Sequence, residues 1–334
     1  MSEKRAEQSG EERLIDRLFR PIAKHPGAFS LMDDAAAIAP PAGHDLILTV
    51  DAVISGVHFL PDDPADAVAK KALRVNLSDL AAKGAAPLGA LLSLSVPENT
   101  GDDWLESFAR GLGEDCNAFE CPLLGGDMTR TPGALTISIT ALGSVPSGTM
   151  VRRRGARAGD LIVVTGTVGD AALGLRLRRA PDDSVMAKLD DAAKEHLRNR
   201  YLLPRPRLAL AATLREHVSA AMDVSDGLVG DLAKLAAVSG VHASIDAARV
   251  PLSAAARAAV GADDRLIDTV LTGGDDYEIV ATVPENRLEP FRAAATKTGN
   301  EVTTIGRIEA GEGTTVIGPG GHPIDLKQAS FSHF

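Results

Sequence analysis

Hydrophobic and polar positions follow two different periods in the first part of the chain. Apolar residues recur every three or four positions in three segments, which predicts amphipathic helices at 11–25, 65–83 and 102–119. Short apolar runs predict strands at 44–54, 88–96 and 134–145. The glycine-rich stretch 123–133 has neither period, so we expect a loop there. Helices and strands are therefore mixed from the start, as in an α/β or α+β protein.

The later part of the chain alternates strands and helices in the same way. A strand, a turn and a helix are predicted within 160–175 and again within 220–240, where the turn is acidic. Polar helical periodicity at 182–200 is followed by a proline-containing connection and a helix, and further strands are predicted around 269–283, 301–308 and 314–318.

The segment 146–160 has little periodicity. It holds four arginines, three glycines and a proline, "PSGTMVRRRGARAGD". We place the domain boundary there, because such stretches commonly link domains. The sequence thus predicts a disordered tail at 1–12, an N-terminal domain at 13–148 and a C-terminal α/β domain at 149–334.

The length, charge and hydropathy of the chain limit the classes of partner that we expect it to bind. A length of 334 residues fits two domains. The net charge of −10 argues against a nucleic-acid partner. No apolar run approaches the roughly 20 residues of a membrane span, and the polar N-terminus lacks a signal peptide, so we expect no membrane partner and a cytoplasmic location. Cys116 and Cys121 lack zinc-site spacing and are expected to be ordinary reduced thiols.

Eight aspartates stand at strand ends or in glycine-rich turns between apolar residues. A turn-forming or helix-capping role explains each one taken singly. Gathered together they would repel one another, and hard divalent cations with oxygen ligands relieve such repulsion. Without a His or Cys cluster, this set indicates Mg²⁺ and phosphate rather than zinc. The eight are Asp34, Asp51, Asp79, Asp127, Asp223, Asp226, Asp275 and Asp276.

Candidate phosphate-binding groups accompany these acids. Gly125 and Gly126 can expose backbone N–H groups to an anion, and guanidinium groups are available at Arg130 and in the run 152–154. The sequence contains no G-x-x-x-x-G-K-[ST] P-loop, no G-x-G-x-x-G dinucleotide motif after a strand and no G-x-S-x-G elbow. These absences exclude the commonest nucleotide-binding and hydrolase motifs.

Several motifs in a fixed order resemble one enzyme family. They are "DDAAAI" (33–38), "TVDAVISGVHF" (49–59), "VNLSDLAAKGA" (75–85), "GGDMTR" (125–130), "DVSDGL" (223–228) and "LTGGDDYEI" (271–279). From about residue 11 to the C-terminus, the chain is similar to the thiamine-monophosphate kinases. These belong to the superfamily of aminoimidazole ribonucleotide synthetase and selenophosphate synthetase.

The resemblance implies a fold and an activity. It implies a two-domain aminoimidazole ribonucleotide synthetase-like α/β fold, a homodimer, and N-terminal domains that pair into a dimeric β-barrel. It also implies ATP-dependent phosphorylation of thiamine monophosphate to thiamine diphosphate, the last step of thiamine diphosphate biosynthesis. ATP would be the co-substrate and several Mg²⁺ ions the cofactors. Direct in-line transfer needs no residue as general base, because the attacking phosphate oxygen is already largely ionised.

The same resemblance assigns roles to residues. ATP contacts fall on Gly126, Asp127, Arg153 and Ser225. Thiamine monophosphate contacts fall on His58, Asp275 and Phe331. Metal ligands fall on Asp34, Thr49, Val50, Asp51, Asp79, Asp127, Asp223 and Asp226.

The chain departs from the family pattern at several of these positions. Asp275 replaces a usual Glu, and Val50 replaces a usual Thr, so that only its main-chain carbonyl could bind metal. A usual C-terminal Trp is missing, which leaves Phe331 as the substitute for stacking on the substrate.

Asp79 lies among leucines and alanines in "LSDLAAKGA" and needs a cationic partner. We expect Mg²⁺ shared with Asp34, Asp51 and Asp223 to meet it, rather than a Lys or Arg. The alternative is a helix-end aspartate bonded to backbone N–H groups.

Two other functions remain open. One is another enzyme of the superfamily. Selenophosphate synthetase normally has a reactive Cys near the N-terminus, whereas the first Cys here is Cys116. A hydrogenase maturation protein of the same superfamily ends in Cys, whereas this chain ends in Phe334. The other is a nucleotide-binding regulator without catalysis, which a turnover assay distinguishes.

Overall fold

The chain divides into two compact units in a computed structural model that describes residues 10–318, 320–324 and 326. The first unit comprises Met1–Leu77 and Pro87–Ser144, and the second comprises Ser78–Ala86 and Val145–Phe334. The second unit therefore begins four residues before the boundary expected from sequence. It also includes residues 78–86, which the sequence analysis placed in the first domain.

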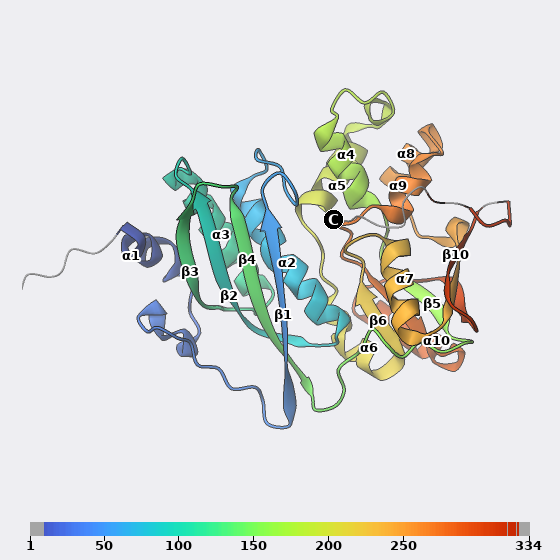
Figure 1. Cartoon of the computed structure of the whole chain (residues 1–334), viewed down its shortest axis with the longest axis horizontal. Coiled ribbons are helices and arrows are strands. Elements are labelled where there is room, and N and C mark those ends of the chain that lie inside the picture. The colour runs from blue at the N-terminus through green and yellow to red at the C-terminus, as the bar shows by residue number, and fades with distance from the viewer. Residues whose placement is uncertain (1–9, 319, 325, 327–334) are drawn as a thin grey trace, which may run out of the picture. The chain divides into compact units, whose positions relative to one another are not determined.

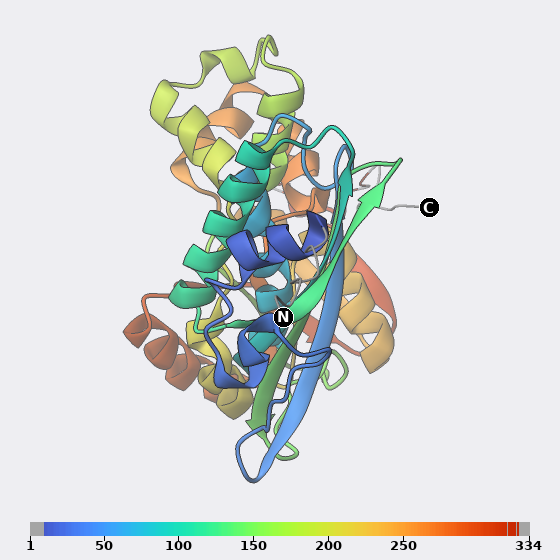
Figure 2. The ribbon, with the colours of Figure 1, turned by 90° about the vertical axis from the view of Figure 1, so that its left-hand side faces the viewer.

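The first unit is built on a four-stranded sheet in the order β1-β4-β2-β3. The strands are β1 (His44–Ile54), β2 (Ala86–Pro97), β3 (Leu123–Thr131) and β4 (Thr136–Pro146). Helices α2 (Ala65–Ala82) and α3 (Asp102–Ala118) cover one face of this sheet (Figure 2). The expected helix at 11–25 is instead α1 (Gly10–Leu14) followed by a π-helical turn over Ile15–Phe19. The mixed α/β character is confirmed.

The other face of this sheet carries exposed apolar side chains. Along β1, Ile47 and Val53 are buried, whereas Leu48 and Val50 are 61% and 60% exposed. Alternation of this kind assigns successive side chains to opposite faces. We call the exposed side chains Leu46, Leu48 and Val50 of β1 the open apolar face. The strand order has two edges, β1 and β3, so the sheet is not a closed barrel.

The glycine-rich stretch at 125–130 is a strand, which corrects the expected loop. It forms most of β3 and pairs in parallel with β2, Gly126 opposite Leu92. A Cβ added to Gly126 would lie 1.9 Å from the Leu92 carbonyl oxygen. Glycine is present there because the two backbones approach too closely for a side chain.

The second unit contains a six-stranded sheet in the order β10-β7-β9-β5-β8-β6 (Figure 1). Only the β10–β7 pair is parallel; the other four pairs are antiparallel. The strands are β5 (Leu161–Thr165), β6 (Ala220–Asp223), β7 (His242–Asp246), β8 (Ile279–Val283), β9 (Val302–Glu309) and β10 (Gly313–Ile317).

Helices pack on both faces of this sheet. They are α4 (Asp170–Arg179), α5 (Asp191–Leu202), α6 (Ala211–His217), α7 (Leu228–Ser239), α8 (Ala254–Ala262), α9 (Leu266–Thr272) and α10 (Leu288–Lys297). One core lies between the sheet and α4, α5 and α7. The other contains Phe291 of α10, Leu214 of α6, and Ala81 and Ala82 from the end of α2. That burial explains why residues 78–86 belong to the second unit.

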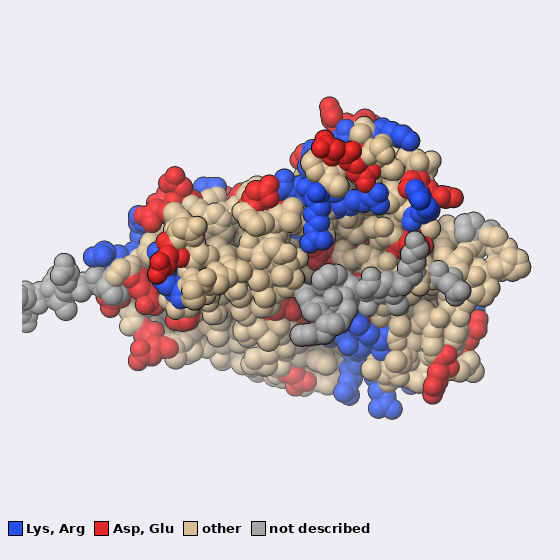
Figure 3. Space-filling view, turned by 45° about the horizontal axis from the view of Figure 1, so that its top comes forward, with Lys and Arg blue, Asp and Glu red and all other residues tan. Residues whose placement is uncertain are grey.

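Charged side chains of both signs share the surface drawn in Figure 3. Among the described residues on that face, Lys and Arg form small groups separated by acidic and uncharged atoms rather than one continuous basic surface. Within the described part of the chain, no helix has both the length and the apolar character needed to cross a membrane.

Candidate functional site

An acidic turn joins β6 to α7 in the second unit. Asp223 ends the strand, and Gly227 precedes the helix with φ at 118°. A Cβ on Gly227 would lie 2.5 Å from the Thr272 carbonyl oxygen, so the tight turn depends on glycine. The Asp231 carboxylate accepts hydrogen bonds from the N–H groups of Ser225 and Asp226, both at 2.9 Å. The turn is thereby fixed at both ends.

Main-chain hydrogen bonds bring three distant segments to this turn. The Val151 N–H donates to the Lys83 carbonyl and the Ala221 N–H to the Arg152 carbonyl, each at 3.1 Å. The Lys83 ammonium donates to the Ala221 carbonyl at 3.0 Å. The end of α2, the arginine run 152–154 and strand β6 therefore lie side by side. Arg153 is exposed and makes no hydrogen bond or ion pair with the described residues, so its guanidinium is available to an anion.

Asp79 and Asp223 form a close acid pair within this unit. Burial first, and then the negative charge of Asp79, raise the pKa of Asp223 to about 8. The positive charge of Lys83 opposes that rise. Asp223 is buried and Asp79 is half-buried, and a pair of carboxylates at close range offers only oxygen ligands, which fits Mg²⁺. The predicted meeting of Asp79 with Asp223 is thus present in the structure.

Lys83 is the cation that the sequence analysis did not expect. It interacts electrostatically with both Asp223 and Asp79, and burial is the main reason why its pKa is lowered. Lys83 thus adds a positive charge near Asp79 that the expectation from sequence did not include, and Mg²⁺ as the partner of Asp79 stays a prediction. The available signal was spacing: Lys83 follows Asp79 by four residues, which on a helix places both on one face.

Asp226 is already ion-paired in the structure. The Lys234 ammonium contacts its carboxylate and lies 2.8 Å from Asp231 Oδ1. A metal ion at Asp226 would therefore compete with Lys234 for this carboxylate. The metal-binding roles of Asp79, Asp223 and Asp226 stay predictions.

The loop that carries Asp275 runs beside the acidic turn. The Asp275 N–H donates to the Ser225 carbonyl at 2.8 Å and the Tyr277 N–H to the Val224 carbonyl at 2.9 Å. Asp275 and Tyr277 have φ of 71° and 50°, a region that side-chain-bearing residues seldom occupy. Such strain is concentrated at functional sites. The predicted substrate residue Asp275 and the predicted ATP residue Ser225 are therefore adjacent.

Buried ionic contacts anchor this loop. Glu278 is fully buried; it accepts from Thr165 Oγ1 at 2.7 Å and from Arg200 at 3.0 Å, and it pairs with Arg207. Asp276 accepts from the Gly169 N–H at 2.7 Å at the start of α4. The sequence analysis identified Asp276 but missed the residues around Glu278, because their contacts join segments far apart in the chain.

The first unit brings two other predicted residues together. Asp34 and Asp127 line one cavity of about 650 Å³, together with Gly125 and Gly126. Asp34 is exposed, and its N–H donates to the Asp33 carboxylate at 2.8 Å. Two of the predicted metal ligands therefore line the same cavity, and their role stays a prediction.

The remaining first-unit candidates lie on or just after β1. The Asp51 N–H donates to the buried Asn76 side chain at 3.0 Å. Asp51 and Thr49 share a face of the strand, whereas Val50 belongs to the open apolar face. His58 follows the strand, and its Nδ1 accepts from the Ile54 N–H at 3.1 Å. Phe331 lies outside the described residues.

The acids come in pairs rather than larger clusters. Among the described residues, no three His, Cys, Asp or Glu side chains are grouped so as to hold a metal ion by themselves. Mg²⁺ is usually held by one or two carboxylates and completed by water and phosphates, so pairs are sufficient. The two cysteines are free and buried, and burial raises the pKa of each thiol to about 12, which confirms ordinary thiols.

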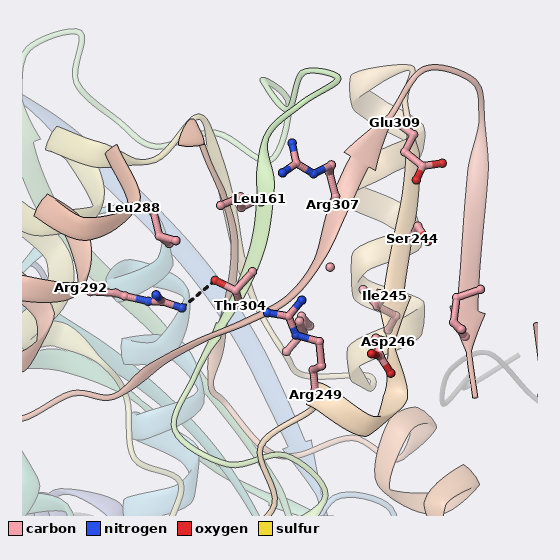
Figure 4. Close-up of a pocket in the computed structure, with 13 residues that line it drawn as sticks. Leu161, Ser244, Ile245, Asp246, Arg249, Leu288, Arg292, Thr304, Arg307 and Glu309 are labelled. Carbon is pink, nitrogen blue, oxygen red and sulfur yellow. Dashed lines mark hydrogen bonds between the residues drawn. The ribbon is translucent and has the colours of Figure 1, made fainter. Parts of the chain in front are cut away.

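A second hollow, of about 560 Å³, lies on the sheet of the second unit and contains no predicted site residue (Figure 4). Arg249, Arg292 and Arg307 line it, together with Asp246 and Glu309. Arg292 donates to Thr304 at 2.9 Å, and Glu289 and Glu285 neutralise Arg292 and Arg307. Because its charges are largely balanced, we assign this hollow no part in the reaction.

Comparison with known proteins identifies the family. Residues 32–145 match the AIR synthase related protein, N-terminal domain, and residues 157–319 match the corresponding C-terminal domain. Thiamine-monophosphate kinase from Caulobacter vibrioides is 43% identical over 90% of this chain and 84% of its own length.

Solved structures agree with this result. Thiamine-monophosphate kinase from Stenotrophomonas maltophilia has a TM-score of 0.82 and 41% identity, over 92% of this chain and 96% of that one. AaThiL complexed with AMPPCP and TMP has a TM-score of 0.77 and 32% identity, over 92% and 97%. The chain therefore belongs to the AIR synthase related protein family, and within it to the thiamine-monophosphate kinases.

Proposed function

We propose that this protein transfers the terminal phosphoryl group of ATP to thiamine monophosphate, which gives thiamine diphosphate in the last step of its biosynthesis. The observation that carries the proposal is the Asp79–Asp223 pair, which lies near Lys83 and the arginine run 152–154 and is bordered by the Asp275 loop. Relatives named for this activity, and one solved with AMPPCP and TMP, support the choice of substrates. A cytoplasmic location fits this role.

Phosphoryl transfer between two anions requires that the reactants be positioned and that their negative charge be neutralised. The acceptor is a phosphate oxygen that is largely ionised near neutral pH, so no side chain needs to remove its proton. When bound, Mg²⁺ would supply positive charge that neutralises the phosphates and so lets the two anions approach. Arg153 contacts phosphate through its free guanidinium, and the rigid turn at Ser225 fixes the position of the nucleotide. We propose direct in-line transfer without a phosphorylated enzyme.

The proposed roles fall on residues of both units. Within the first unit, Asp34, Thr49, Val50, Asp51 and Asp127 would hold Mg²⁺. Within the second unit, Asp79 and Asp223 would hold it, together with Asp226, where Lys234 would compete with the metal. Gly126, Asp127, Arg153 and Ser225 contact ATP. His58 and Asp275 contact thiamine monophosphate.

The test is direct. The purified protein is incubated with ATP, MgCl₂ and thiamine monophosphate, and thiamine diphosphate is measured by chromatography. We expect product with thiamine monophosphate and none when free thiamine replaces it. Product from free thiamine alone overturns the substrate assignment. A phosphoprotein formed from labelled ATP at the rate of turnover overturns the in-line mechanism.

We also propose that the active form is a homodimer paired through the first unit into a shared barrel. The open apolar face supports this, because Leu48 and Val50 are more than half exposed on an edge strand. Contiguous exposed apolar residues commonly mark protein interfaces.

A further inference from the structure

The position of Lys83 is fixed by two elements. Its N–H donates to the Asp79 carbonyl at 3.0 Å, which extends the helical hydrogen-bonding pattern past the end of α2 and keeps Asp79 and Lys83 on one face. Its ammonium donates at 3.0 Å to the carbonyl of Ala221, two residues before Asp223 on β6. The ammonium is thereby held against β6, where it interacts electrostatically with both acids of the pair.

More negatively than positively charged groups lie around the Asp79–Asp223 pair. Asp79, Asp223 and Asp231 supply negative charge around the pair, and Lys83 supplies the positive charge that acts on it. Arg153 acts on Lys83 as a like charge, so it also lies nearby. Lys234 is paired with Asp226 and Asp231 at the other end of the turn. Lys83 is therefore a cation that offsets the charge of the pair before any ligand arrives.

We propose that Lys83 is a resident counter-cation of the Asp79–Asp223 pair, which stabilises the metal-free protein and weakens the binding of a divalent ion there on its own. This rests on the proposed function, in which this pair holds Mg²⁺. A fixed ammonium beside a cation site repels an arriving dication, and the repulsion is strong where water is excluded. Nucleotide phosphates offset that repulsion. Lys83 thus favours metal that arrives together with phosphate.

The experiment measures metal binding rather than turnover. Mn²⁺, a spectroscopic substitute for Mg²⁺, is titrated without nucleotide into the wild type and into Lys83→Met, with free Mn²⁺ followed by electron paramagnetic resonance. We expect the variant to gain about tenfold or more in Mn²⁺ affinity. We expect its melting temperature in EDTA to fall and to recover on addition of Mn²⁺.

Control variants show whether the change in Mn²⁺ affinity comes from the charge of Lys83 and depends on Asp223. Lys83→Arg keeps the charge and should bind Mn²⁺ as weakly as the wild type. Lys83→Gln can still donate a hydrogen bond to the Ala221 carbonyl, so it tests the charge if Lys83→Met misfolds. Lys194→Met removes a lysine that also donates to a carbonyl in this unit, at 3.4 Å from Ala187, and should change nothing. Adding Asp223→Asn to Lys83→Met should abolish the gain in affinity.

The outcomes separate this inference from the proposed function. Unchanged Mn²⁺ affinity in both Lys83→Met and Lys83→Gln overturns the role of Lys83. Tighter binding that persists in the Asp223→Asn double variant overturns its assignment to this pair. Failure of the wild type to make thiamine diphosphate instead overturns the proposed function, while the Mn²⁺ comparison remains interpretable.

Discussion

Asp223 makes the stability of this protein depend on pH. Its folded pKa of about 8 lies above the ordinary value of 3.8, so the folded state binds the proton more tightly than the unfolded state. Without divalent ions, the free energy of unfolding should therefore fall between about pH 4 and pH 8, by at most about 1.4 kcal/mol per pH unit from this group. Urea unfolding in EDTA across this range measures the slope.

The variant Asp223→Asn isolates this contribution from the other titrating groups. Asp231 and Asp276 also have raised pKa values because they are buried, so the wild type retains their pH dependence. The expected result is a shallower fall in stability for the variant. Equal slopes in the two proteins would show that Asp223 is ionised across the whole range.

A substitution of Asp79 tests the other member of the acid pair. Asp79→Asn removes the charge that raises the pKa of Asp223 and one proposed metal ligand. Turnover should drop on the order of 100-fold or more, because metal-assisted charge neutralisation contributes several kcal/mol to such transition states. Circular dichroism should show an intact fold. Near-normal turnover would remove Asp79 from the metal site.

Two substitutions at Asp275 separate the role of its side chain in substrate binding from the role of its backbone conformation in stability. Asn accepts a positive φ about as readily as Asp, so Asp275→Asn should leave stability unchanged. Its KM for thiamine monophosphate should rise about tenfold, the size of one lost charge-assisted hydrogen bond, while the KM for ATP stays the same. Asp275→Ala should raise the same KM and also cost about 1 kcal/mol of stability, because alanine is strained at that φ. An unchanged KM in both variants excludes contact with the substrate.

At the scale of single residues, the sequence predicted acids better than cations. An aspartate in an apolar segment is conspicuous because such a position is costly, and Asp79 and Asp223 were found in this way. Lys83 directly follows a helix and Lys234 lies on one, where lysine is common, and only the contacts with β6 and with the acidic turn reveal their positions.

At the scale of secondary-structure elements, two neighbouring glycines of β3 differ in the space available for a side chain. Gly126→Ala places a Cβ 1.9 Å from the Leu92 carbonyl oxygen, whereas at Gly125 the nearest atom is a Leu91 methyl carbon at 3.4 Å. The first substitution should destabilise the protein by about 1–3 kcal/mol because the strands must separate. The second should change stability by less than about 0.5 kcal/mol. Urea unfolding of the two variants compares them; similar losses would contradict the close approach.

Most elements were predictable because their hydrophobic periods are clear. The strand at 44–54 and the helices at 65–83 and 102–119 lie within a residue or so of β1, α2 and α3. The strand β3 was not predictable, since a Gly-Gly-Asp sequence is typical of turns and only pairing with β2 makes it a strand. The short π-helical turn after α1 likewise carries no distinct sequence signal.

For the whole molecule, the testable feature is association through the open apolar face. Leu48→Lys places a charge among exposed apolar residues of β1 and should convert the proposed homodimer to a monomer in light scattering. Val238→Lys introduces the same change at a residue of the second unit that is 46% exposed, and should leave the dimer intact. A dimer that survives Leu48→Lys would place the interface elsewhere.

Helix α2 has a consequence for any attempt to divide the gene. The helix is continuous over Ala65–Ala82, yet Leu77 ends one part of the first unit and Ser78 begins the second. A fragment that starts at Val145 would lack Ser78–Ala86 and with it Asp79 and Lys83. Neither half of a chain cut there should be active alone, and function should return only when both halves are co-expressed. Recombination between relatives should likewise preserve sequence pairing between α2 and β6.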